Sequence, residues 1–159
     1  MQKSRSRGFA LTVALLSLTG CIDTDATVFV EATLESATLS LSQSSLAAGL
    51  DGQAVIRLDL GPRASGPSSV ALVGARLTSV DGSRTLVSLQ PTTDPAVPVD
   101  VPVDSEVRLS LAFARDDNAV AAEDASDLCS EQANLVVVLE GSLRGGTIDV
   151  TSGPLSLCE

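Results

Sequence analysis

Apolar and polar residues alternate along most of the chain after residue 27. A period of two places successive side chains on opposite faces of an extended strand, so the pattern predicts strands with one buried face. The clearest segments are 28–35, 39–42, 54–60, 107–113 and 147–152. Helical periodicity is weak throughout, and the sequence therefore predicts an all-β fold.

Two further segments predict a hairpin and a central strand. The apolar stretch 70–80 is followed by Asp81-Gly82 and then by residues 84–89, and Asp-Gly between apolar runs favours a hairpin. Residues 133–143 are apolar on both faces at their centre, which is typical of a strand inside a sheet. In total we expect about eight strands roughly 10 to 20 residues apart, a spacing that favours a β-sandwich.

Two segments leave alternatives open. Residues 91–104 contain four prolines, Pro91, Pro95, Pro98 and Pro102. Because proline cannot donate to a strand ladder, this segment is either an edge strand or a loop that crosses between sheets. Residues 117–132 are rich in Ala, Asp and Glu and form either a helix or a long loop.

The predicted core is aliphatic, with aromatic bulk from Phe29 and Phe113 alone. The run 37–60, a Ser-rich strand followed by a turn through Gly49 and Gly52, resembles the opening of bacterial immunoglobulin-like domains. The chain lacks the tryptophan of the third strand, the tyrosine corner and the usual inter-sheet cysteines of such domains. The resemblance therefore implies an immunoglobulin-like β-sandwich over residues 27–159 and transfers no functional residue.

The N-terminal residues have the features of an export signal. Lys3, Arg5 and Arg7 precede an apolar run at residues 9–18, and no acidic residue lies nearby. This run is too short to cross a bilayer as a helix, which needs about 20 residues. A basic start followed by a short apolar region is typical of a secretory signal peptide.

The apolar run ends in Leu18-Thr19-Gly20-Cys21, which resembles the lipobox of bacterial lipoproteins. The resemblance implies cleavage before Cys21 and lipid attachment to its thiol. It gives a signal peptide at 1–20, a tether at 21–26 and a membrane-anchored domain. The alternative is an ordinary secretory signal with Cys21 as a bystander, but no clear A-x-A cleavage site is present.

The residue after the lipidated cysteine sorts lipoproteins in enteric bacteria, where an aspartate retains them in the inner membrane. Here Ile22 occupies that place and Asp23 lies one position later. The resemblance therefore implies the cell envelope as the location and favours the outer membrane over the inner membrane.

The expected mature chain is strongly acidic. Three of the ten basic residues lie in 1–20, so residues 21–159 keep seven Arg and no Lys against 20 acidic residues, a net charge of −13. Such a charge repels phosphate and excludes nucleic acid as a partner. Residues 22–26 reach at most about 17 Å when extended, so the domain would lie close to the membrane.

Cys129 and Cys158 are the two remaining cysteines. In the oxidising environment of an exported protein, two such thiols usually pair. In the chain-entropy model, a bridge between them would stabilise the fold by about 3.5 kcal/mol. A redox or metal-binding pair is the alternative, although the spacing is not that of a CxxC motif.

Catalytic residue types are scarce. The chain has no His, and the expected mature chain has no Lys, so it cannot contain a Ser-His-Asp triad or a lysine-activated nucleophile. Phosphate-binding motifs of the G-x-x-x-x-G-K-[ST] and G-x-G-x-x-G types are absent. Acid–base chemistry by carboxylates alone remains, but the chain has no Trp or Tyr to hold a sugar. We therefore expect no enzyme and no cofactor.

One acidic cluster is a candidate binding site, in residues 116–127. Its oxygen-bearing side chains are Asp116, Asp117, Asn118, Glu123, Asp124 and Asp127. The spacing does not match an EF-hand, so we expect a solvated acidic loop, with a calcium site as the alternative. The leading functional prediction is a non-catalytic, membrane-anchored envelope lipoprotein that acts as an interaction or structural module with an envelope protein partner. The alternative is a ligand- or calcium-binding lipoprotein.

Overall fold

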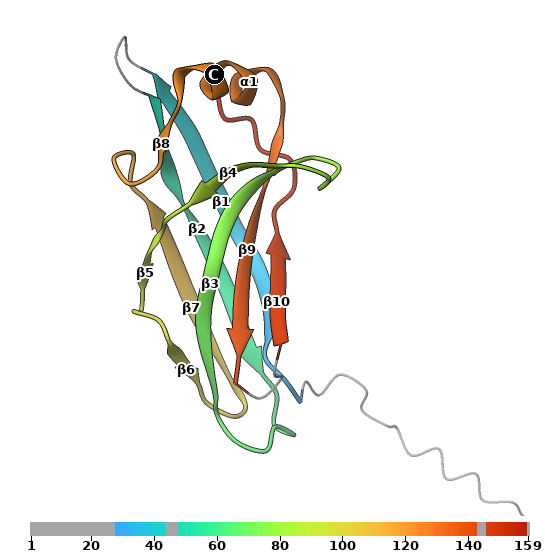
Figure 1. Cartoon of the computed structure of the whole chain (residues 1–159). Coiled ribbons are helices and arrows are strands. Elements are labelled where there is room, and N and C mark those ends of the chain that lie inside the picture. The colour runs from blue at the N-terminus through green and yellow to red at the C-terminus, as the bar shows by residue number, and fades with distance from the viewer. Residues whose placement is uncertain (1–27, 44–47, 143–145, 159) are drawn as a thin grey trace, which may run out of the picture.

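The computed structural model describes residues 28–43, 48–142 and 146–158, and these contain ten strands and one short helix. The predicted all-β class is confirmed. The strands form two antiparallel sheets that pack face to face as a sandwich (Figure 1). The predicted signal peptide and tether, including Cys21, lie outside the described residues.

The first sheet has the strand order β1-β2-β7-β5, and β8 pairs with the start of β2. Its strands are β1 (Glu31–Gln43), β2 (Ala48–Leu60), β7 (Ser105–Phe113), β5 (Thr92–Asp94) and β8 (Ala119–Val120).

The second sheet has the strand order β10-β9-β3-β4, and β6 pairs with the start of β3. Its strands are β10 (Gly146–Thr151), β9 (Ala133–Gly141), β3 (Ser68–Ser79), β4 (Thr85–Leu89) and β6 (Val99–Val101). The order of the two sheets corresponds to the ABED and GFC sheets of an immunoglobulin sandwich, with β1 as strand A and β10 as strand G.

The described part has more strands than the roughly eight predicted. The additional ones, β5, β6 and β8, have two or three residues each, which is too short for an alternating pattern. In contrast, the two segments expected at 28–35 and 39–42 are one strand, β1. The pairing of β1 with β2 shifts register between Leu34 and Ser36, and this β-bulge explains why the apolar positions change phase there.

The proline-rich segment 91–104 does cross between the sheets. Its strand β5 pairs with β7 in the first sheet, and β6 pairs with β3 in the second. The Asp94–Pro95 and Val97–Pro98 peptide bonds between these strands are cis. Both alternatives from the sequence thus hold, since the segment crosses the sandwich and also supplies edge strands.

Other sequence predictions are confirmed at the level of single elements. β9 lies between β10 and β3 and is buried on both faces at Leu135, Val136 and Val137. Asp81-Gly82 lies in the turn between β3 and β4, and Gly82 has a φ of 72°, which favours glycine. Residues 117–132, for which the sequence allowed either a helix or a long loop, contain a helix, α1 (Ala122–Ser130).

Gly49 and Gly52 lie within β2, so the predicted turn through them is wrong. Gly52 is required for a different reason. It has a φ of 151°, and a Cβ atom there would collide with the backbone oxygen of Thr38 on β1. The glycine thus permits a close approach of two strands.

The core between the sheets is aliphatic, as predicted. Phe113 is buried, but Phe29 is 47% exposed, so the expected contribution of Phe29 to the core is wrong. Val30, the next residue, takes the buried position, and alternation directs Phe29 away from it. The largest fully buried side chains are Leu50, Ile56, Leu58, Leu60, Leu77, Leu109, Leu111, Leu135, Leu139, Leu157, Val70 and Val101.

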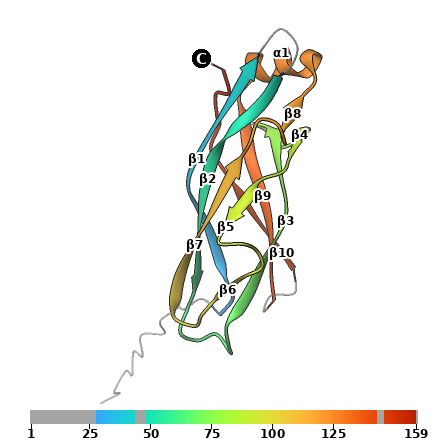
Figure 2. The ribbon, with the colours of Figure 1, turned by 90° about the vertical axis from the view of Figure 1, so that its left-hand side faces the viewer.

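Different elements lie at the two ends of the sandwich. β1 starts at one end, and the C-terminus, α1 and the β3–β4 hairpin lie at the other (Figures 1 and 2). The 13 residues of β1 span about 43 Å at roughly 3.3 Å per residue. We call residues 79–85 and 122–132 together the hairpin–helix end.

Candidate functional site

A disulfide at the hairpin–helix end joins Cys129 of α1 to Cys158, and their Cα atoms are 5.2 Å apart. This confirms the predicted pair. Leu157 beside it is buried, and its carbonyl accepts a hydrogen bond of 2.7 Å from the N–H of Leu41 on β1. The disulfide therefore fastens the helix to a C-terminal segment that is itself bound to the edge of the first sheet.

The acidic cluster predicted at 116–127 is divided by the fold, and Asn118 is its buried member. Asn118 is only 3% exposed. Its Oδ1 accepts a hydrogen bond of 2.7 Å from the N–H of Gln90, and its Nδ2 donates one of 2.8 Å to the carbonyl of Ala114. The side chain fastens the turn before β8 to the chain after β4, so it is not available to bind calcium.

The remaining members of the cluster lie apart from one another. Asp116 and Asp117 belong to the turn before β8, whereas Asp124 and Asp127 lie on α1. Among the side chains that the structure describes, which exclude that of Glu123, no group of three or more Cys, Asp or Glu could hold a metal ion. The calcium interpretation therefore has no described ligand set.

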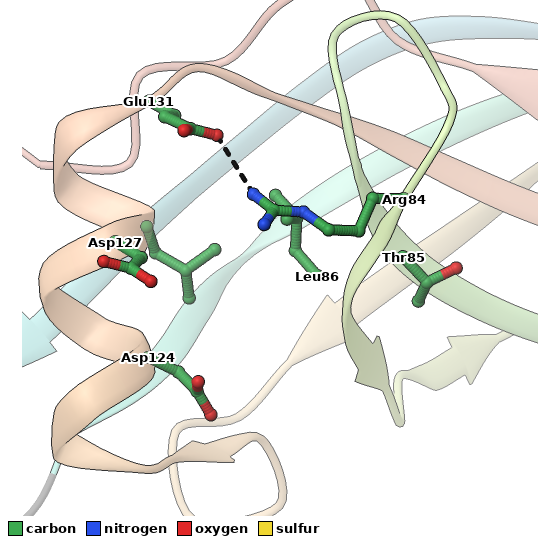
Figure 3. Close-up of a pocket in the computed structure, with 7 residues that line it drawn as sticks. Arg84, Thr85, Leu86, Asp124, Asp127 and Glu131 are labelled. Atoms are coloured by element: carbon green, nitrogen blue, oxygen red, sulfur yellow. Dashed lines mark hydrogen bonds and ion pairs between the residues drawn. The ribbon is translucent and has the colours of Figure 1, made fainter.

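A cavity of about 180 Å³ separates α1 from the start of β4 (Figure 3). Across it, Nη2 of Arg84 donates to Oε2 of Glu131 over 3.3 Å and links the hairpin to the end of the helix. Residues of α1 at a spacing of three or four point the same way, which places Asp124, Asp127 and Leu128 on its wall. The full lining is Arg84, Thr85, Leu86, Asp124, Asp127, Leu128 and Glu131.

A second hollow, of about 370 Å³, lies beneath the β3–β4 turn on the outer face of the second sheet. Its walls include an ion pair between Arg76 of β3 and Asp149 of β10, with 3.8 Å between nitrogen and oxygen. Its lining residues are Arg76, Thr78, Val80, Asp81, Gly82, Ser83, Thr85, Asn134, Val136, Asp149 and Thr151. We call it the turn hollow.

Two residues of the turn hollow hold buried oxygens without a hydrogen-bond partner, Thr78 Oγ1 and Asn134 Oδ1. The two residues are cross-strand neighbours on β3 and β9. Thr78 is 5% exposed, while the Nδ2 of Asn134 donates a hydrogen bond of 3.2 Å to the carbonyl of Val80. Buried polar atoms are nearly always paired, so this pair of oxygens is unusual.

The turn above the hollow is organised around Asp81. Its carboxylate accepts hydrogen bonds from the hydroxyl of Ser79 at 2.5 Å and from the N–H of Ser83 at 3.0 Å. These bonds, first that from Ser79, stabilise the charged form and lower the pKa of Asp81 to about 2. The turn therefore holds a fixed negative charge at the rim of the hollow.

A separate charged surface lies on the outer face of the first sheet, but its charges satisfy one another. Arg108 bonds to Glu35 at the bulge of β1 over 2.9 Å, and Arg57 bonds to Asp59 over 2.8 Å. The bond from Arg108 lowers the pKa of Glu35. Arg108 also pairs with Glu106 over 2.9 Å, so this network is best explained as a stabilised sheet face.

Sequence reasoning missed Arg84, Thr78 and Asn134. Thr78 and Asn134 come from strands far apart in the chain, so no local pattern joins them. One signal was available, since Thr78 is a polar residue inside the apolar stretch 70–80. The polar groups of both cavities can bind by charge and hydrogen bonding, and the expected lack of catalysis stays a prediction.

Comparison with protein-family models, with curated proteins and with solved structures finds no match to this chain. No helix in the described part of the chain is long and apolar enough to span a membrane.

Proposed function

We propose that the protein is a non-catalytic envelope lipoprotein that is anchored by a lipid on Cys21 and presents its hairpin–helix end to a protein partner. The basic start, the short apolar run and the lipobox-like Leu18-Thr19-Gly20-Cys21 support the anchor. Ile22 after the cysteine supports the outer membrane as the location.

The observation that carries the proposal is the position of the hairpin–helix end relative to the first described residues. β1 starts at the opposite end of the sandwich, about 43 Å away along the strand (Figure 1). The five residues 22–26 allow a tether of at most about 17 Å. Cavities, helix and disulfide would then face away from the membrane, where a partner can reach them.

The charge of the domain supports the same orientation. With −13 on residues 21–159, the domain is repelled by anionic lipid headgroups at short range. A domain held by one short tether and repelled by the surface projects its far end into the surrounding space.

Site-specific photo-cross-linking in cells tests the proposal, together with the intact mass of the membrane-bound protein. Val80 belongs to the β3–β4 connection and Val103 to the β6–β7 connection, and both are exposed, at 50% and 36%. The two connections lie at opposite ends of the sandwich (Figure 1). A cross-linking amino acid at Val80 should give a discrete adduct with one envelope protein, while the matched substitution at Val103 should not.

Two results would count against this function. An unmodified mass in a soluble fraction would remove the anchor. Equal cross-linking at Val80 and Val103, or none at either, would remove the hairpin–helix end as the contact surface.

A further inference from the structure

The turn hollow is an open depression on the outer face of the second sheet, and two of its lining residues hold buried oxygens that lack hydrogen-bond donors. Asn134 Oδ1 can only accept, and Thr78 Oγ1 can accept or donate. An unpaired buried oxygen destabilises a fold, so a site that keeps two of them side by side is suited to a group that brings donors.

The walls of the hollow restrict the charge of such a group. Asp81 and Asp149 supply two carboxylates, and Arg76 supplies one guanidinium that is already paired with Asp149. The net charge of these three side chains is negative, so the hollow favours a cation. The hydroxyl of Ser79 and the N–H and hydroxyl of Ser83 all donate to the carboxylate of Asp81, so the turn holds this negative charge in one place.

The hollow also has an apolar part. Val136 is 7% exposed and lies among the lining residues, and the half-exposed Val80 stands at the turn. A ligand that matches this lining has an aliphatic stem and ends in a cation with several N–H donors. Lysine and arginine side chains have this chemistry.

We propose that the turn hollow binds the ammonium or guanidinium end of a lysine or arginine side chain of the envelope partner. This inference rests on the proposed function and names the chemistry of its contact. The stem lies against Val80 and Val136, and the cation donates to Thr78 Oγ1 and Asn134 Oδ1. Because both oxygens are buried, the entering group displaces part of the turn, so a free side chain binds weakly.

The test titrates the full lipidated chain in detergent micelles with Nα-acetyl-lysine methylamide and the arginine equivalent, and follows amide shifts by NMR. We expect saturable shifts at Thr78, Asn134 and Val136 with dissociation constants on the order of millimolar, as is usual for one side chain. The norleucine equivalent keeps the stem without the ammonium group and should produce no saturable shift.

Two substitutions locate the contact. Thr78→Val removes a hydroxyl but keeps the side-chain shape, and should weaken lysine binding about fivefold, the size of one hydrogen bond. Thr33→Val makes the same change at an exposed threonine of β1 and should leave binding unchanged. Asp149→Asn is a second test at an exposed position, where folding is not at risk, and should also weaken binding.

Several outcomes would overturn the inference. They are the absence of saturable shifts with either cationic probe, equal binding of norleucine, and unchanged binding in both Thr78→Val and Asp149→Asn. Cadaverine binding at least about tenfold tighter than both capped side chains would assign the hollow to a free amine instead. Cross-linking at Val80 without lysine binding would reject this inference alone, whereas a missing lipid would reject the proposed function and leave the titration unaffected.

Discussion

The hydroxyl of Thr78 gives the most direct test at the scale of single residues. It is buried without a partner, which costs about 1–3 kcal/mol of desolvation that no hydrogen bond offsets. Thr78→Val removes the hydroxyl and retains a β-branched side chain suited to a strand. We expect the free energy of unfolding to rise by about 1 kcal/mol in urea denaturation, with no change for Thr33→Val. A loss of stability would show that the hydroxyl has a partner in solution.

Asn118 is the opposite case, because both the oxygen and the nitrogen of its buried side-chain amide have hydrogen-bond partners. Asn118→Ala leaves the N–H of Gln90 without its partner and removes the side-chain hydrogen bond to the carbonyl of Ala114, which keeps its bonds from backbone N–H groups. We expect the free energy of unfolding to fall by about 3 kcal/mol, measured by urea denaturation. Gln132→Ala, at an exposed amide next to α1, is the control and should change stability little. A small effect of Asn118→Ala would mean that other groups replace these bonds.

Asp81 connects the β3–β4 turn to acid stability. Its pKa is about 2 in the fold against 3.8 ordinarily, so the folded state favours the charged form. The resulting stability is fully present above pH 3.8 and is lost as the pH falls towards 2. In Asp81→Asn we therefore expect a flatter dependence of the melting temperature on pH between these values. Parallel curves for the variant and the wild type would contradict the assignment.

At the scale of elements, the sequence predicts long strands well and short ones poorly. β2, β7 and β9 carry enough alternating or apolar residues to identify them. The two- and three-residue strands β5 and β8 exist because long neighbours offer them free backbone groups, which is a tertiary effect. The bulge in β1 was visible only as a change of phase, and whether such a change marks a bulge or a turn depends on the partner strand.

The acidic cluster shows why the candidate site was harder to predict than the fold. Residues 116–127 are adjacent in sequence, yet the fold buries Asn118 and places Asp124 and Asp127 on a helix. In the turn hollow, residues that are distant in sequence come together, since Thr78 and Asn134 become neighbours only through the pairing of β3 with β9. Local patterns therefore located the strands, while the polar groups of the site depend on contacts distant in sequence.

The disulfide links two elements of the fold, since it joins α1 to the C-terminal segment. Replacing Cys129 and Cys158 by Ala should lower the free energy of unfolding by about 2–4 kcal/mol. Hydrogen exchange should accelerate at Leu41, whose N–H is bonded to Leu157. Reductant should destabilise the wild type and leave the double variant unchanged. Equal stability of the two oxidised proteins would show that the bridge contributes little.

At the scale of the whole molecule, the proposed anchor and the folded domain are separate in sequence. Among the residues that the structure describes, the buried core begins at Val30, and Cys21 lies outside them. Cys21→Ser should therefore move the protein from the membrane to the soluble fraction while its melting temperature stays the same. Ser17→Ala, a similarly small change within the apolar run, is the control and should leave the protein in the membrane fraction.

The anchor should also control contact with the partner. Attachment to the same membrane raises the effective concentration of two proteins, and a short tether restricts the domain to one height above the surface. In Cys21→Ser, a cross-linker at Val80 should therefore give much less adduct although the hairpin–helix end is intact. Restoring the anchor with a flexible insertion of 20 residues after Asp25 should restore membrane binding but only part of the adduct, because the end is no longer held at a fixed height. Full cross-linking without the anchor would place the partner away from the membrane and separate the interaction from the lipid.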